Sequence, residues 1–166
     1  MDNTLTRYLE GIHDRRDAYQ LRRIMKSPIN ALSSQPLTSA GLVIHGAASL
    51  VAKTGAAAFY AVANGVLVTI AAATDMPALT GINAPAGGYN VACFYIDSAS
   101  VVTALGGTSA ATLGGVIFPT PPDGKALVGF LIITYASAFT GGTTALDTAT
   151  TVYVSPLGAF DPSALV

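Results

Sequence analysis

The chain has 166 residues, of which 51% are hydrophobic and only 10% are charged, and its formal net charge is −1 at pH 7. This length allows one domain with an appendage. The near-neutral charge excludes a general attraction to nucleic acid or acidic membranes, and the single cysteine excludes an internal disulfide framework. Ten of the 17 Lys, Arg, Asp and Glu residues lie between residues 2 and 26. A charged arm on an almost uncharged body predicts a subunit that is held by its neighbours.

Residues 1–27 are predicted to form a charged, amphipathic helical arm. Asn3 or Thr4 can cap this helix, and Ser27 ends it because the residue before a proline is pushed out of the helical region. Arg15-Arg16 and Arg22-Arg23 are seven residues apart, so both pairs lie on one side of the helix. Apolar side chains follow helical spacing along the arm: Leu5, Tyr8, Leu9, Ile12 and Tyr19.

The residues after the arm are predicted to form an extended linker, 28–40, and a β-body, 41–166. Pro28, Pro36 and several serines argue against regular structure in the linker. Asn64-Gly65 lies between two apolar runs and is a strong signal for a tight hairpin. The strands expected in the body, in chain order, are residues 42–45, 59–63, 66–70, 89–97, 101–105, 116–118, 126–135 and 150–154.

The strand expected at residues 126–135 is apolar on both of its alternating faces, which predicts a central strand covered on both sides. Residues 139–142 are expected to turn. Seven or eight strands with turns every 8–12 residues predict an antiparallel β-sandwich or jelly-roll. The fold class is therefore mainly β, with an N-terminal α-helical arm.

The positive mean hydropathy raises the possibility of a membrane protein. Three stretches lack charge for 20 or more residues: 54–74, 98–122 and 126–146. Each is interrupted by glycine, proline or polar residues, whereas a spanning helix needs about 20 predominantly apolar residues. We therefore expect no membrane span, and the charged N-terminus predicts no signal peptide.

The sequence offers few residues for catalysis or metal binding. His13 and His45 are the only histidines, and no Cys, His and Asp residues have zinc-ligand spacing. Cys93 lies in an alternating strand pattern, which favours a small buried core residue over a nucleophile. We expect no enzyme, no cofactor and no metal. The aspartates at or near turns are expected to cap them, with a calcium site as the lesser alternative: Asp97, Asp123, Asp147 and Asp161.

Residues 111–147 contain four runs that belong together. They are Leu-Gly-Gly-Val-x-Phe-Pro at 113–119, a proline-rich turn with a lysine at 121–125, Val-Gly-Phe-Leu-Ile-Ile at 128–133, and Phe-x-Gly-Gly-Thr-Thr-Ala-Leu-Asp at 139–147. With the hairpin at 59–70 and the strand at 89–97, this pattern resembles virion structural proteins of tailed bacteriophages, of the capsid decoration (cement) or head-fibre type. The resemblance implies a subunit that is usually trimeric, and it does not cover the arm.

The function expected from this resemblance is non-enzymatic decoration of the outer capsid surface by a homotrimer that stabilises the shell. The expected partners are the major capsid protein and other copies of the chain, with no nucleic acid and no membrane, and the expected location is the capsid exterior of the virion. The alternative is a head-fibre, tail-fibre or adhesin subunit that binds a host receptor or glycan, with exposed loop residues such as Tyr89-Asn90 stacking on sugars.

The arm is the expected anchor to the capsid. The alternative without a binding role is a solvent-exposed helix face. Nucleic-acid binding is disfavoured because six basic and four acidic residues leave the arm a net charge of only +2. As an anchor, the arm would supply apolar contacts and polar registration through eight residues: Leu5, Tyr8, Ile12, Arg15, Arg16, Tyr19, Arg22 and Arg23.

Overall fold

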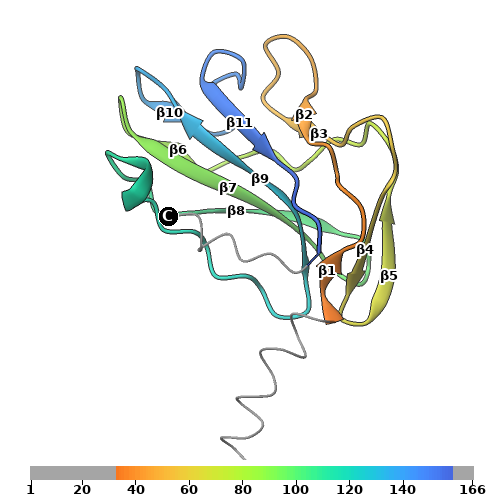
Figure 1. Ribbon diagram of the computed structural model, residues 1–166. Helices are drawn as coiled ribbons and strands as arrows, with labels where there is room; N and C mark the ends of the chain where they lie inside the picture. Colours follow the sequence, from red (N-terminus) through yellow and green to blue (C-terminus); the bar gives the residue numbers. More distant parts are fainter. Residues whose placement is uncertain (1–32, 159–166) are drawn as a thin grey trace, which may run out of the picture.

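Residues 33–158 form a mainly β structure of antiparallel sheets in the computed structural model, which describes this part of the chain (Figure 1). This confirms the predicted β class, whereas the helical arm predicted for residues 1–27 lies outside the described residues. The strands are β1 (Gln35–Pro36), β2 (Val43–Ile44), β3 (Ala52–Lys53), β4 (Phe59–Ala63), β5 (Val66–Ile70), β6 (Asn83–Ala84), β7 (Tyr89–Ile96), β8 (Val102–Gly106), β9 (Ala126–Thr134), β10 (Phe139–Thr140) and β11 (Thr150–Val154).

The larger sheet has four strands in the order β11-β9-β7-β8, all antiparallel to their neighbours. The predicted central strand is confirmed, since β9 lies between β7 and β11 and is buried along most of its length. The side chains of β7 alternate between the two faces of this sheet, and both faces are covered. Its odd-numbered residues Val91, Cys93 and Tyr95 pack on one face, and its even-numbered residues Ala92, Phe94 and Ile96 pack on the other.

A β-bulge interrupts the pairing of β7 with β9. Phe94 pairs with Gly129 and Tyr95 pairs with Leu127, so Val128 is an extra residue on β9. The bulge changes which alternate positions of β9 face each side of the sheet. Gly129 is required here because an added Cβ would lie 2.6 Å from the Val154 carbonyl oxygen and 2.6 Å from Leu42 Cδ1.

The smaller sheet has the order β1-β4-β5. Its β4–β5 hairpin turns at Asn64 and Gly65, whose φ angles of 50° and 77° are those of the two-residue turn that Asn-Gly favours. The predicted hairpin is therefore confirmed with its expected bounds. Gln35 and Pro36 pair with Val62 and Ala61, which places this part of the predicted linker, 28–40, against the sheet.

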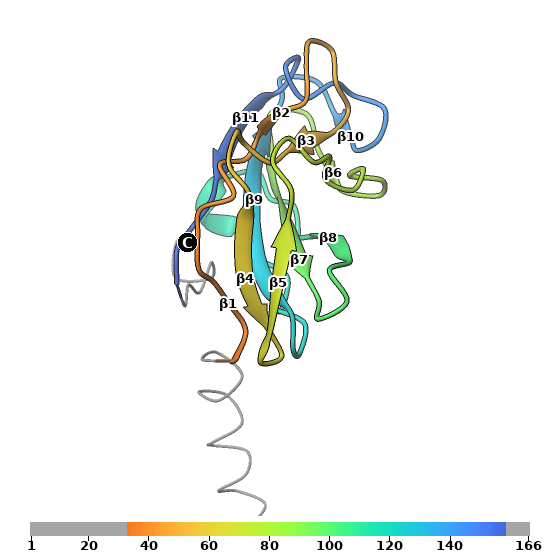
Figure 2. The same ribbon diagram turned by 90° about the vertical axis from the view of Figure 1, so that its right-hand side faces the viewer.

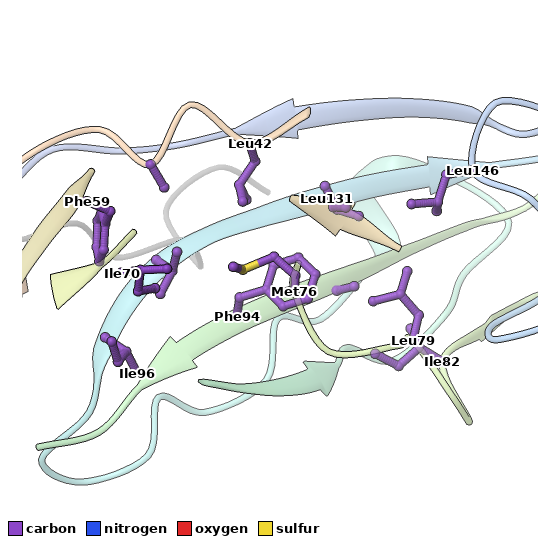
Figure 3. Packing of buried hydrophobic residues seen from close by; sticks show 14 of the residues in the cluster. Leu42, Phe59, Ile70, Met76, Leu79, Ile82, Phe94, Ile96, Leu131 and Leu146 are labelled. Carbon is purple, nitrogen blue, oxygen red and sulfur yellow. The ribbon is translucent and has the colours of Figure 1, made fainter. Parts of the chain in front are cut away.

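Two hydrophobic clusters cover the two faces of the larger sheet, and the first of them joins it to the smaller sheet. The first lies on the face of the larger sheet that is turned toward β4 and β5, and Figure 3 shows Phe59, Ile70 and Phe94 within it. The second lies on the opposite face, where Val116 and Phe118 cover β7 and β9. In this second cluster the rings of Phe118 and Phe130 meet edge to face, with centroids 5.3 Å apart and an interplanar angle of 89°.

Several expectations for short segments were wrong. Residues 116–118 form no strand: Ile117 makes only an isolated bridge to Thr108, and its neighbours are buried by side-chain packing rather than by a ladder. The segment expected to turn at 139–142 begins with β10, which pairs with β6. The two-residue strands β1, β3 and β6 were not predicted. Between β1 and β11 the one helical element is a 3-10 turn, Leu113–Gly115.

Candidate functional site

The predicted capsid-binding residues lie in the arm, outside the described residues 33–158. The structure therefore places none of the eight: Leu5, Tyr8, Ile12, Arg15, Arg16, Tyr19, Arg22 and Arg23. It does place the point at which the described chain begins. The Gly65 amide donates a hydrogen bond to the Ser33 carbonyl oxygen at 2.8 Å, so residue 33 lies beside the turn of the β4–β5 hairpin.

Charged side chains of the body gather at its two ends. At one end, the backbones of Lys53 and Asp75 form an isolated antiparallel β-bridge, and His45 Nδ1 contacts the Asp75 carboxylate. Asp147 lies at the same end, where its carboxylate accepts a hydrogen bond from the Ala48 amide at 2.7 Å. The Asp147 bond ties the β2–β3 loop to the loop that precedes β11, and the Asp75 contacts tie β2 and β3 to the segment after β5.

The remaining described charges lie at the opposite end of the larger sheet. Lys125 Nζ is 3.8 Å from the Asp97 carboxylate, and Asp123 lies in the adjacent turn. Asp97 Oδ1 accepts hydrogen bonds from the amides of Ala99 and Val101, both at 3.0 Å, which confirms the predicted capping role for this aspartate. The nine residues of β9 separate the two ends by roughly 30 Å, at 3.3–3.4 Å per residue.

The sides of the body carry no charge within the described residues, and one side presents an apolar sheet face. We call it the outer sheet face: Gln35, Leu37, Tyr60, Val62, Leu67 and Thr69, from the side of β1-β4-β5 that is turned away from the first cluster. The exposed fractions are 63% for Leu67, 49% for Leu37 and 42% for Tyr60. In Figure 2, β4 and β5 lie in front of the larger sheet.

Strand β5 leaves an edge of the smaller sheet open. The backbone of Tyr60 bonds toward β1, since its carbonyl accepts from the Leu37 amide at 2.8 Å and its amide donates to Thr38 Oγ1 at 2.8 Å. Backbone groups alternate in direction along an antiparallel strand, so Tyr60 and Val62 bond toward β1 and not toward β5. The residues opposite them on β5, Thr69 and Leu67, therefore direct their amide and carbonyl groups away from β4. From the described part of the chain, no hydrogen bond reaches them. Strand β5 also has no proline, charge or bulge to protect its edge.

The described residues show how potential metal ligands and the single cysteine are placed. Among residues 33–158, no group of three or more His, Cys, Asp and Glu side chains could hold a metal ion. Cys93 is fully buried, as predicted. Its burial raises the pKa of the thiol from 9.0 to about 12, and a hydrogen bond with Tyr95 opposes this rise only in part. The thiol therefore keeps its proton at neutral pH and is a poor nucleophile.

Asn90 does not offer the exposed amide that the glycan-binding alternative expected. It is only 3% exposed. Its side-chain amide donates to the Asn83 carbonyl oxygen at 2.6 Å, and its side-chain oxygen accepts from the Val91 amide at 2.8 Å. Asn90 is thus a structural residue that connects β7 to β6, and the expectation that it faces a sugar was wrong.

No family model, curated protein or solved structure matches the chain. In the part of the chain that the structure describes, no helix is both long enough and apolar enough to cross a membrane. The described surface of the body therefore has three notable features: charge at both ends, an uncharged outer sheet face and an open strand edge.

Proposed function

We propose that this protein is a non-enzymatic capsid decoration protein of a tailed bacteriophage, which binds the outer surface of the shell as a homotrimer. In this proposal the body is a β-sandwich, whose layers are the two sheets joined by the first hydrophobic cluster. The helical arm of residues 1–27 docks on the major capsid protein. The protein carries no catalytic site and binds neither nucleic acid nor membrane.

The observation that supports this proposal best is the distribution of charge over the body. Six charged residues of the described chain lie at two ends about 30 Å apart, and the sides between them are uncharged. Surfaces that are depleted in charge are typical of the cores of protein interfaces. A subunit packed side by side with its copies would cover these sides and leave its polar ends in water.

A trimer that binds only the assembled shell would stabilise that shell by mass action. Any species that binds one state and not the other shifts the equilibrium toward the bound state by RT ln(1 + [L]/Kd). Three arms held in one trimer bind with an avidity well above that of one arm, because the second and third contacts are intramolecular. The individual arm contacts can therefore be weak.

Deletion of residues 1–27 tests the proposed anchor. The truncated chain should remain folded and trimeric, as measured by circular dichroism and sedimentation, and should no longer sediment with purified capsids. The full-length chain is the control in both measurements. Undiminished capsid binding by the truncated chain would show that the arm is not the anchor.

The number of copies on the virion separates decoration from the fibre role. Labelling the protein in electron micrographs of virions should reveal hundreds of copies distributed over the shell. A few copies confined to one vertex or to the tail would instead support the head-fibre or adhesin alternative and count against decoration.

A further inference from the structure

We infer that the outer sheet face, together with the open edge of β5, is the contact between copies of this chain. The occupant of this face is a second copy, so that the faces of three copies surround the threefold axis of the trimer. This inference rests on the proposed homotrimer and names the surface that forms it.

The first step of the argument concerns the side chains of the face. Leu37, Tyr60 and Leu67 are each more than two-fifths exposed, and Val62 lies between them, directly across from Leu67 in the β4–β5 ladder. These residues form a contiguous apolar patch and are not isolated exposed side chains. Contiguous patches of this kind on soluble proteins mark interaction sites.

The second step concerns charge and decides in favour of a second copy. A face that meets its own copy must not repel it, and like charges placed together across an interface cost several kcal/mol. The outer sheet face satisfies this condition because it has no charged side chain, whereas both ends of the body do. An acidic or basic partner would find no complementary charge on this face.

The third step concerns the backbone at the rim of the face. Leu67 and Thr69 direct their amide and carbonyl groups outward from β5, and open strand edges of this kind readily pair with another chain. Around a threefold axis each contact joins two different surfaces, so the neighbouring copy would cover these groups and supply their hydrogen-bond partners from another segment. The edge and the apolar face share Leu67, so one interface covers both.

The fourth step concerns the chain that precedes the body. Thirty-two residues come before Ser33, which lies beside the turn of the β4–β5 hairpin. Copies that meet through the outer sheet face would therefore bring their three N-terminal segments together at one end of the trimer. This placement lets the three arms act on one capsid site.

The test compares two lysine substitutions in the full-length chain, Leu67→Lys and Ile117→Lys. The two side chains are matched in exposure, at 63% and 65%. Ile117 lies between two residues of the second cluster, on the far side of the larger sheet from the outer sheet face. Sedimentation equilibrium at micromolar concentration should show loss of the trimer for Leu67→Lys and an unchanged trimer for Ile117→Lys, with unchanged circular dichroism for both.

In this comparison, a trimeric Leu67→Lys variant or equal dissociation of both variants would overturn the inference. Amide hydrogen exchange of the wild-type chain gives an independent readout if Leu67→Lys fails to fold. The Leu67 and Thr69 amides should exchange slowly in the trimer, and fast exchange would refute the contact.

Capsid binding separates this inference from the proposed function. A Leu67→Lys variant that stays trimeric and binds capsids would refute the inferred interface but would be compatible with decoration. If the wild-type chain is trimeric and Leu67→Lys dissociates it, but the wild-type trimer does not bind capsids, the interface is supported and decoration is refuted. A monomeric wild-type chain would overturn both.

Discussion

Replacing Gly129 with alanine tests the close packing at the β-bulge. The added Cβ would lie 2.6 Å from Leu42 Cδ1 and 2.6 Å from the Val154 carbonyl oxygen, whereas ordinary contacts are at 3.4–4 Å. The Leu42 methyl group lies at the end of a flexible side chain and can move. The Val154 carbonyl belongs to the backbone of β11, and Val154 pairs with Phe130 on β9. Relieving the clash with this oxygen therefore requires a shift of strand β11.

The expected cost follows from these two contacts. Inserting a methyl group into a well-packed site typically costs about 1–3 kcal/mol, and the reduced entropy of the unfolded chain returns only about 0.4–1 kcal/mol. We therefore expect Gly129→Ala to lower the melting temperature by roughly 2–10 °C for a chain of this size. Leu42→Val should not rescue the variant, because the clash with the carbonyl oxygen remains.

Thermal unfolding followed by circular dichroism measures this effect. Gly114→Ala is the matched control, because nothing lies within 4 Å of its added Cβ. All variants are compared at one protein concentration, since oligomerisation makes the melting temperature depend on concentration. A melting temperature of Gly129→Ala equal to or above that of Gly114→Ala would refute the packing argument at the bulge.

Two further predictions concern Cys93 and Asp97. The unfolded chain loses the Cys93 proton above pH 9, while the folded chain holds it to about pH 12. Between these values the free energy of unfolding should therefore fall as the pH rises, by up to about 1.4 kcal/mol per pH unit. Denaturant unfolding at pH 8 and pH 10.5 should show a smaller pH-dependent loss for Cys93→Ala, and equal losses would contradict the pKa. Asp97→Ala removes the acceptor of two amide hydrogen bonds and should destabilise by about 1–2 kcal/mol in the same assay. Asp97→Asn keeps one carbonyl acceptor and should lose less than half as much, since the partly exposed ion pair with Lys125, at 3.8 Å, contributes little; equal stability of Asp97→Ala and the wild type would argue against the cap.

The parts of the fold that local chemistry determines were predicted well from the sequence. The bounds of β4 and β5 were correct because Asn64-Gly65 fixes the hairpin and the strands alternate cleanly around it. Strand β11 was also correct, and β9 was recognised as central from its continuous apolar run. In each case a pattern within about ten residues contains the information.

The parts that depend on distant contacts were missed. Strand β1 exists because Gln35 and Pro36 meet β4, and two residues carry no alternation that could reveal this. The apolar run of β9 does not reveal the bulge at Val128, because a run that is apolar on both faces looks the same before and after a shift. The apolar run at 116–118 predicts a strand, but Val116 and Phe118 are buried by packing in the second cluster and not by pairing in a ladder.

The candidate surface was predicted only in its general character. The sequence establishes that the body has few charges, and from this the prediction of a held subunit follows. It does not reveal that Asp75, Lys53 and Asp147 share one end, because the fold brings together residues up to 99 positions apart, as in the bond between Ala48 and Asp147. The outer sheet face likewise emerges only when β1, β4 and β5 are placed side by side.

The two ends of the described chain lie at the same sheet, which makes the body suitable for circular permutation. Gly158 donates a hydrogen bond to the Pro36 carbonyl at 3.0 Å, and Pro36 is only three residues from Ser33. A short glycine-rich link from residue 158 to residue 33 would therefore close the β-body into a ring without crossing the core. New ends could then be opened in the exposed loop between β2 and β3, at Ala47-Ala48, to give a circular permutant with the same sheets.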